Sequence, residues 1–329
     1  MLAALAAPPI RQRLANFARI VISVGLLAVL VTGADVQALW RTLQAANVWL
    51  YLACIPISTL GMFLRALRWH VTLRASGTRV SFRRAFYLCY VGAFFNTFLP
   101  SGLGGDVVRV LEIGPGATSQ QATGTILVER MAGFAVLFGL AAVALPFSAA
   151  FLPPLTVWLI GALTAGVLGA TALLLEGKLL RRVMARLPRA ISLAGDTWLG
   201  QTYNVITQVG WRVLGIAALI SLIFNGSIVF SNWLVTRAFG LDVPLWGVAV
   251  VLPIIAATLL VPISISGFGV REGVVVALLL QMGVNAEQGL LLSLAWYGLD
   301  VIDGLFGGVI YFVTGLLGLR PQTAEGAGK

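Results

Sequence analysis

Long runs of apolar residues are the feature that most limits how this chain can fold. An α-helix needs about 20 such residues to cross roughly 30 Å of hydrocarbon. Only 10% of the 329 residues are charged, against about 25% in soluble domains. We therefore expect a single all-α polytopic membrane domain over residues 1–329, with about six full transmembrane helices. The runs that suit full spans are 17–31, 48–64, 126–145, 155–175, 211–235 and 290–317.

The basic residues lie beside these runs. The net charge of +10 by itself would also suit a nucleic-acid-binding protein, but most of the 22 Lys and Arg residues fall in four segments that flank apolar runs. Cytoplasmic loops of membrane proteins carry such an excess, and anionic lipid attracts it. We therefore expect a multi-pass inner-membrane protein with both termini in the cytoplasm and no nucleic acid as partner. The four segments are 11–19, 65–84, 178–189 and 320–329.

A count of crossings predicts that one apolar segment turns back within the membrane. An even number of spans must join two cytoplasmic segments, yet three apolar runs lie between Arg84 and Lys178. The run 85–99 is short for a span and ends in the glycine-rich turn PSGLGGD at 100–106. We expect a re-entrant hairpin over about 85–114 that enters from the cytoplasm.

The C-terminal half contains a segment of the same kind. Short apolar runs at 245–261 and 270–282 flank the turn PISISGFG at 262–269, which predicts a second hairpin over about 245–283 that enters from outside. Matching breaks on opposite sides favour an inverted repeat, in which such segments form a transporter binding site. The alternative is that both breaks are ordinary helix ends at the membrane surface. Between the halves, about 178–209 predicts an amphipathic connector on the cytoplasmic surface.

Ionisable residues inside apolar segments are candidates for a substrate site, because each costs at least about 2.5 kcal/mol near mid-bilayer. Asp300 and Asp303 are three residues apart, so they should share one helix face with Tyr297. Arginines suit phosphate, and carboxylates suit amines or hydroxyls. The alternative is that these charges form interhelical ion pairs that only hold the bundle together. The charged candidates are Asp106, Arg109, Glu129, Arg130, Arg271, Glu272, Asp300 and Asp303.

Glycines and polar residues near the breaks complete the predicted substrate site. Glycine-rich turns at helix N-termini present backbone N–H groups that favour anions. A stripe of Ser221, Asn225 and Asn232 is suited either to joining helices or to lining a cavity. No catalytic set, metal-ligand spacing or nucleotide-binding motif is evident, so we expect no enzyme, metal or cofactor. The remaining expected substrate-binding residues are Asn96, Pro100, Gly102, Gly104, Gly105, Gly267 and Gly269.

Three motifs resemble a known family. They are NTFLPSGLGGDVVR at 96–109, Glu129-Arg130 followed by Gly133, and SGFGVREG at 266–273. Together they resemble the lysylphosphatidylglycerol synthase transmembrane family, also called flippase-like domain proteins. The resemblance implies the membrane half of aminoacyl-phosphatidylglycerol synthase/flippase proteins, which moves modified lipids between leaflets. Only a short tail follows Leu319, so we expect a standalone member without the aminoacyltransferase domain.

The leading hypothesis is an integral membrane lipid translocase that moves a polar-headgroup lipid between leaflets. Three alternatives stay open, namely an ion-coupled small-solute transporter, an intramembrane lipid-modifying enzyme, and an accessory subunit of an envelope-lipid pathway. The expected partners are membrane lipids with a phospholipid or modified-lipid headgroup. A second copy of the chain or a separate lipid-synthesis enzyme is a further partner to consider.

Overall fold

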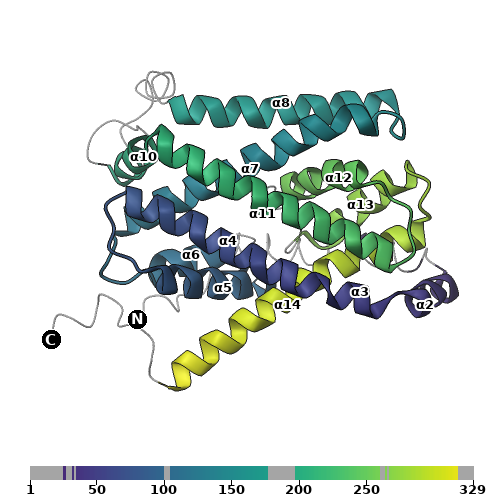
Figure 1. Ribbon diagram of the computed structural model, residues 1–329, viewed down its shortest axis with the longest axis horizontal. Helices are drawn as coiled ribbons and strands as arrows, with labels where there is room; N and C mark the ends of the chain where they lie inside the picture. Colours follow the sequence, from purple (N-terminus) through teal and green to yellow (C-terminus); the bar gives the residue numbers. More distant parts are fainter. Residues whose placement is uncertain are drawn as a thin grey trace.

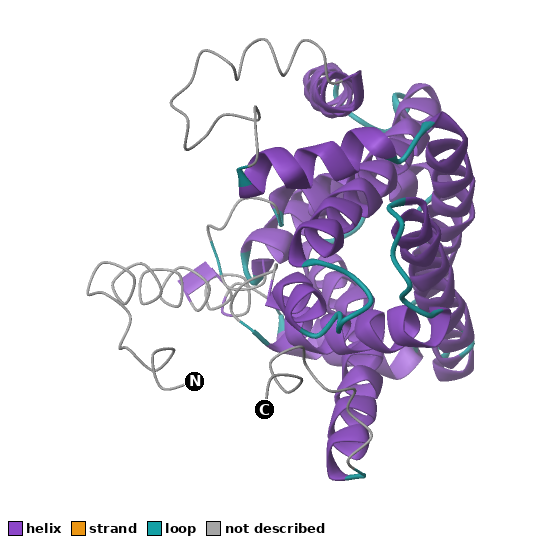
Figure 2. Ribbon diagram, turned by 90° about the vertical axis from the view of Figure 1, so that its left-hand side faces the viewer, coloured by secondary structure: helices purple, strands orange, loops and turns teal. Residues whose placement is uncertain are grey.

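The fold is described by a computed structural model, and Figures 1 and 2 show a bundle of helices packed side by side. The structure describes residues 25, 26, 32, 35–99, 104–176, 197–259, 264 and 267–317. Within these ranges every regular element is a helix and no strand is present, so the all-α prediction is confirmed. The helix α2 spans Val36–Ala45. Asp35 caps its N-terminus, because the Asp35 carboxylate accepts a hydrogen bond from the backbone N–H of Gln37 at 2.8 Å.

Five helices among the described residues are long and apolar enough to cross a membrane. Their outer surfaces carry large apolar side chains such as Trp158, Leu219 and Phe312, which are 78%, 60% and 58% exposed. So much exposed apolar surface is suited to lipid, and the chain is a multi-pass membrane protein. The predicted run at 17–31 lies mostly outside the described residues, so the number of six spans stays a prediction. The five helices are α3 (Val48–Leu52) continuing into α4 (Cys54–Ala75), α7 (Ser119–Ser148), α8 (Pro154–Glu176), α11 (Trp211–Ala238) and α14 (Ala286–Leu316).

A first pair of short helices folds back toward its own beginning. The pair is α5, Phe82–Phe98, and α6, Gly104–Leu111. The guanidinium of Arg84, in the first turn of α5, donates to the backbone carbonyl of Glu112, directly after α6. Ile113 shares a buried apolar cluster with Ala122 in the first turn of α7. The pair therefore begins and ends near the start of α7, and it occupies the segment predicted as the first hairpin.

A second pair of short helices lies toward the other end of α7. The pair is α12, Leu245–Thr258, and α13, Val270–Leu280. Phe147, in the last turn of α7, stacks on Trp246 in the first turn of α12, with ring centroids 4.8 Å apart. A Cβ at Gly247 would lie 2.9 Å from the sulfur of Met282, which comes just after α13. The beginning of α12 and the end of α13 are thus neighbours, at the end of α7 opposite to the first pair.

The second part of the predicted connector is a helix that packs on α7. This helix is α10, Trp198–Gln208, and residues 177–196 lie outside the described residues. Tyr203 and Ile206 of α10 form a buried cluster with Val128 of α7. The contact is close, because a Cβ at Gly124 would lie 2.8 Å from the Cβ of Val205. This packing gives α10 an architectural role against the first half of α7.

Two large apolar clusters stabilise opposite ends of α4. Cys54, at the start of α4, belongs to a buried cluster with side chains of α11, α12, α13 and α14. Trp69 and Leu73, near its end, belong to another with α5 and the start of α7. Ser58 belongs to neither cluster and lies on α4 between these two ends. Polar side chains gather at this middle level of the bundle, which is where the candidate site is found.

Candidate functional site

Two carboxylates and four arginines from three helices form a buried group of ion pairs. Its centre is Glu129 of α7, which is 1% exposed. The Oε2 atom of Glu129 accepts a hydrogen bond from Arg109 of α6 at 2.5 Å. Its Oε1 atom accepts from Arg65 and Arg68 of α4, each at 3.2 Å. One carboxylate therefore joins α4 and α6 to α7. We call the group the arginine cluster, which comprises Arg65, Arg68, Asp106, Arg109, Glu129 and Arg130.

Asp106 is the second carboxylate of the arginine cluster. Its two oxygens accept hydrogen bonds from Arg109 at 3.1 Å and from Arg130 at 2.6 Å. Arg109 has no exposed surface, and its guanidinium lies 3.9 Å from the centroid of the Trp69 ring. Gly92 makes room for it, since a Cβ there would come within 2.9 Å of Arg109 Cδ. The charge of Arg109 is thus balanced within the fold.

Arg68 extends the arginine cluster to α11. Its guanidinium donates to the hydroxyl of Ser221 at 2.8 Å. One turn later, the side-chain amide of Asn225 donates to the backbone carbonyl of Gly133 on α7 at 3.2 Å. Two members of the predicted polar stripe therefore join helices. The third member, Asn232, lines the cavity described next.

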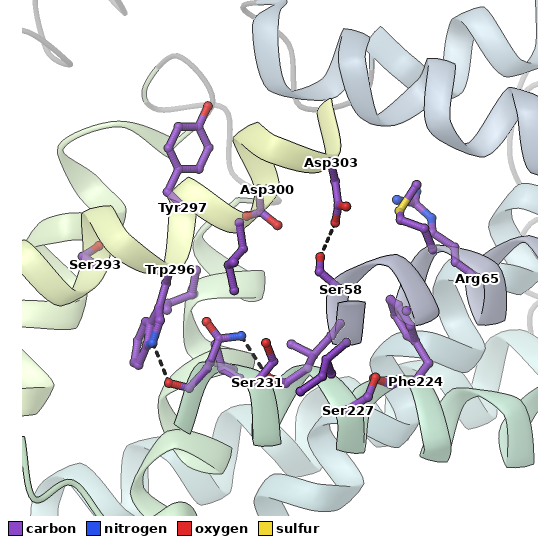
Figure 3. Close-up of a pocket in the computed structure, with 18 of the residues that line it drawn as sticks. Ser58, Arg65, Phe224, Ser227, Ser231, Ser293, Trp296, Tyr297, Asp300 and Asp303 are labelled. Carbon is purple, nitrogen blue, oxygen red and sulfur yellow. Dashed lines mark hydrogen bonds between the residues drawn. The ribbon is translucent and has the colours of Figure 1, made fainter. Parts of the chain in front are cut away.

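A cavity of about 210 Å³ lies among α4, α11 and α14, with α12 and α13 contributing to its wall. Figure 3 shows side chains around it, with Ser58 and Arg65 on α4 and Asp300 and Asp303 on α14. Both signs of charge are present in the lining. Arg65 belongs to the arginine cluster and to this cavity, with 21% of its side chain exposed. The polar lining residues are Ser58, Arg65, Ser227, Ser231, Asn232, Arg271, Ser293, Tyr297, Asp300 and Asp303.

Three buried polar atoms at the cavity have no hydrogen-bond partner. Asp303 is 7% exposed, and its Oδ2 accepts from the hydroxyl of Ser58, whereas its Oδ1 has no partner (Figure 3). The hydroxyls of Ser231 and Ser293, in residues that are 3% and 1% exposed, also lack one. Because buried polar groups are nearly always hydrogen-bonded, these atoms mark positions for polar atoms of water or of a ligand.

The predicted face of α14 is confirmed. Asp300, Asp303 and Tyr297 all line the cavity, as their spacing requires for residues on one side of a helix. Among them Asp300 is the most accessible, since its side chain is exposed rather than buried. Two carboxylates of one helix are therefore directed to the same polar space.

The glycine motif before α13 brings Arg271 to the cavity wall. Gly267 and Gly269 have φ angles of +80° and +83°, which residues with a side chain rarely adopt. Glu272, with no exposed surface, accepts from the backbone N–H of Gly269 at 2.6 Å and from Arg271 Nε at 3.0 Å. The Arg271 guanidinium lies 4.0 Å from the centroid of the Tyr297 ring. The turn and Glu272 thus hold this arginine in place.

The glycine motif before α6 allows α5 and α6 to pack closely. A Cβ at Gly105 would lie 1.9 Å from the carbonyl oxygen of Gly92, so α5 and α6 touch through their backbones. The N–H of Gly105 also donates to Asn96 Oδ1 at 2.8 Å. Gly104 is buried beside it at the start of α6. These residues set the shape of the α5–α6 pair and do not line the cavity. Pro100 and Gly102 lie outside the described residues.

The predicted charged candidates fall into two regions rather than one. Only part of the set lines the cavity, and the rest forms ion pairs that fit the alternative of a structural role. Arg65 is the residue that the two regions share. The cavity contains Arg271, Asp300 and Asp303, Glu272 supports Arg271, and the arginine cluster contains Asp106, Arg109, Glu129 and Arg130.

Several cavity residues were not found from the sequence. The sequence predicts Arg65 and Arg68 in a basic cytoplasmic flank, but α4 continues through both to Ala75, and Arg68 is 3% exposed. Ion pairing with Glu129 is what allows them inside the bundle. The available signal was weak, because isolated hydroxyls such as Ser58 and Ser293 are common in apolar helices. The missed lining residues are Ser58, Arg65, Ser227, Ser231 and Ser293.

Metal-binding geometry is not found in the part of the chain that the structure describes, where no three His, Cys, Asp or Glu side chains come together. Cys54 and Cys89 are free and buried. The lining of the cavity offers hydroxyl, carboxylate, amide and guanidinium groups, which form hydrogen bonds and ion pairs.

Together, the fold and the cavity define a multi-pass helical membrane protein with a small charged space between its spans. The family model described as Lysylphosphatidylglycerol synthase TM region matches residues 16–308. The match covers most of the chain, so the protein belongs to this family, and the resemblance found in the sequence is confirmed. The comparison with curated proteins and with solved structures gave no match.

Proposed function

We propose that the protein is a lipid translocase that moves a polar-headgroup lipid between the leaflets of the inner membrane. The observation that carries this proposal is the cavity of about 210 Å³, which is lined by arginine and aspartate between long apolar helices. Ser58 lies in the middle part of one candidate span and Asp303 in the middle part of another. Ionisable residues at such depth are costly and mark substrate paths. Membership of a lipid-related family supports the proposal.

We infer that the two folded-back helix pairs are re-entrant hairpins. Their helices have 17 and 8 residues in the first pair and 14 and 11 in the second, which is below the roughly 20 needed to span. They lie toward opposite ends of α7, so one enters from the cytoplasm and the other from outside. Such an arrangement supports an inverted repeat with the binding site near the middle of the membrane. The basic flanks place both termini in the cytoplasm.

The size of the cavity suits a headgroup and not a whole lipid. Its volume is about 210 Å³. A drug-sized ligand needs about 300–1,000 Å³. The acyl chains of a bound lipid would therefore stay outside the cavity, against the apolar surfaces of the helices, while the headgroup crosses inside.

Opposite charges in the lining give each part of a headgroup a partner. Arg65 and Arg271 offer guanidinium groups to a phosphate. Asp300 and Asp303 offer carboxylate oxygens to an amine or a hydroxyl. Tyr297, beneath the Arg271 guanidinium, keeps that charge oriented. A phospholipid with a polar or zwitterionic headgroup fits this combination.

The arginine cluster serves as the frame of the site. Glu129 holds Arg65 by a hydrogen bond of 3.2 Å while the rest of that side chain reaches the cavity. The same carboxylate fixes the first hairpin through Arg109. The cluster therefore positions one phosphate-binding arginine and anchors α6, without contacting the headgroup through its other members.

A leaflet assay tests the proposal. The purified chain is reconstituted in vesicles of phosphatidylethanolamine and phosphatidylglycerol that carry a trace of fluorescent phosphatidylethanolamine, phosphatidylglycerol or phosphatidylcholine. The rate at which label becomes accessible to an external quencher is measured against protein-free vesicles. We expect faster transfer with the wild-type chain and loss of it in Arg271→Gln and Asp300→Asn. The matched control is Arg237→Gln, which removes a half-exposed arginine that pairs only with the exposed Asp242.

The outcome separates the site from the fold. Equal transfer rates for Asp300→Asn and the wild type would show that the cavity does not take part in lipid transfer. Absence of transfer for every label would refute translocation of these headgroups and favour a small-solute transporter, because a cavity of about 210 Å³ also holds a whole small solute. Uptake of radiolabelled solutes into the same vesicles measures that second function.

We further infer that the chain acts on lipids without changing their covalent structure and needs no cofactor. Mass spectrometry of the vesicle lipids after the assay tests this inference, since any product of altered mass would identify a lipid-modifying enzyme instead. Native mass spectrometry of the purified protein tests whether a second copy is its partner. Transfer by the purified chain alone would argue against a role as an accessory subunit.

A further inference from the structure

Asp303 differs from every other buried carboxylate in the described part of the chain. The other three are Asp106, Glu129 and Glu272, and each accepts hydrogen bonds from at least one arginine. Asp303 is equally buried, but its contact is the uncharged hydroxyl of Ser58, and its Oδ1 has no partner. An ionised carboxylate without a paired cation is costly in a protein interior. Binding a proton removes that cost.

The surroundings of Asp303 allow its charge to change. On its own helix, a second carboxyl, that of Asp300, and the phenol of Tyr297 line the same cavity. From α4 it faces Arg65, which is already held by Glu129. Arg271 of α13 also lines the cavity, and its charge is balanced by that of Glu272. From α5, the phenol of Tyr90 is close enough to interact electrostatically with Asp303.

The helix α11 contributes no charge to this environment. Its residues at the cavity are neutral, and among them the hydroxyl of Ser231 has no partner. The hydroxyl of Ser293, which lies ten residues before Asp303 on α14, also has no hydrogen-bond partner. Hydroxyls can both donate and accept hydrogen bonds, so together with water in the cavity they are suited to passing a proton to and from Asp303.

We propose that Asp303 is the proton-binding residue through which the cavity couples movement of its cargo to a proton gradient. In the loaded state the proton is on Oδ1 while Oδ2 accepts from Ser58. On release, the Oδ1–H bond breaks and a cavity water takes the proton to the solution, which leaves a carboxylate. Reloading reverses the step when the cavity is open to the other side. The proton site stands by itself, whereas the coupling rests on the proposed function.

Infrared spectroscopy tests the proton site without any lipid substrate. The full chain in detergent is titrated from acid to alkaline pH while the C=O band of protonated carboxyl groups is followed. We expect a titrating band that disappears in Asp303→Asn and shifts in Asp303→Glu, which keeps a carboxyl there. The matched control is Glu287→Gln, which removes a carboxyl from the first turn of α14 and should retain the band. An unchanged band in Asp303→Asn overturns the proton site.

A vesicle experiment then tests the coupling. Vesicles of phosphatidylethanolamine and phosphatidylglycerol with fluorescent phosphatidylethanolamine are given a pH gradient of either direction or none. We expect the gradient to change the transfer rate for the wild type and for Glu287→Gln, and the gradient dependence to be lost in Asp303→Asn. If the transfer rate of the wild type is the same with and without the gradient, the coupling is refuted while the proposed function stands. An Asp303 infrared band without any lipid transfer refutes the proposed function while the proton site stands.

Discussion

The arginine cluster and the cavity use the same kinds of side chain in opposite ways. In the cluster, Glu129 accepts from three arginines, and Arg109 is fully enclosed. In the cavity, Asp303 has one hydroxyl partner, and Asp300 is in no ion pair among the described residues. The difference teaches that charge inside a membrane protein is not by itself a sign of function. Charges that are enclosed in ion pairs away from the cavity hold helices together, and those that line the cavity are available to a substrate.

Breaking the arginine cluster should have the largest effect. Glu129→Gln leaves Arg65 and Arg68 without a counter-charge in the interior, and it leaves Arg109 with Asp106 as its one acidic partner. Removing one partner of a buried ion pair costs about 3–5 kcal/mol, so we expect a large loss of thermal stability in detergent. The melting temperature, followed by tryptophan fluorescence, measures it, with Glu287→Gln as the control. A melting temperature equal to that of the control would contradict the structural role of the cluster.

Crowding the first helix pair should have the next largest effect. Gly105→Ala would place a Cβ 1.9 Å from the carbonyl oxygen of Gly92, so α5 and α6 would have to separate. Overpacking of this kind costs about 1–3 kcal/mol. The same stability measurement applies, and Gly139→Ala on α7 is a suitable control, because its Cβ would meet nothing within 4 Å. Equal stability of both variants would show that the close approach is not required.

Removing the hydroxyl at Ser58 should have a smaller effect on stability. Ser58→Ala takes away the one hydrogen bond to Asp303 Oδ2, which contributes on the order of 1 kcal/mol. The informative result is the infrared band of Asp303, which should shift because its carboxyl has lost a donor. Ser227→Ala, whose hydroxyl lines the cavity but bonds the carbonyl of Phe224, is the control. A band that stays in place would show that Ser58 does not act on Asp303.

The smallest stability change is expected where a carboxylate is unpaired. Asp303→Asn removes a charge that has no ion-pair partner, so the free energy of unfolding should change by less than about 1 kcal/mol or rise. Lipid transfer should nevertheless lose its dependence on the pH gradient. Comparison with Glu129→Gln by thermal melting and by the leaflet assay sharpens the contrast between the two regions. A loss of stability as large as that of Glu129→Gln would show that Asp303 is structural.

Much of the fold followed from local features of the sequence. The apolar runs predicted the positions of five described helices that are long enough to span. The turns at 100–106 and 262–269 predicted where two helix pairs would break, and the pairs begin and end within a few residues of the expected limits. Length, hydropathy and glycine content act through the nearest residues and the surrounding solvent, so they can be read along the chain.

Which charged residues line the cavity and which form the arginine cluster could not be predicted in this way. The sequence does not distinguish the charged residues of the two regions, since all are charges within apolar or glycine-rich segments. Examples are Asp106, Arg109, Asp300 and Asp303. Ser58 and Asp303 are 245 positions apart, and Arg68 and Ser221 are 153 apart. Which of these side chains meet depends on the rotation and tilt of each helix against its neighbours, which small differences in packing decide.

The sequence by itself determined that this protein is a helical, multi-pass membrane protein of a lipid-related family, because an apolar segment in a membrane must satisfy its own backbone hydrogen bonds. Only the tertiary structure decided which charges are neutralised. It placed three arginines around Glu129 and left Asp303 beside a single hydroxyl. The physical reason is that pairing depends on distances of a few ångströms between different helices, and the order of residues along the chain does not fix those distances.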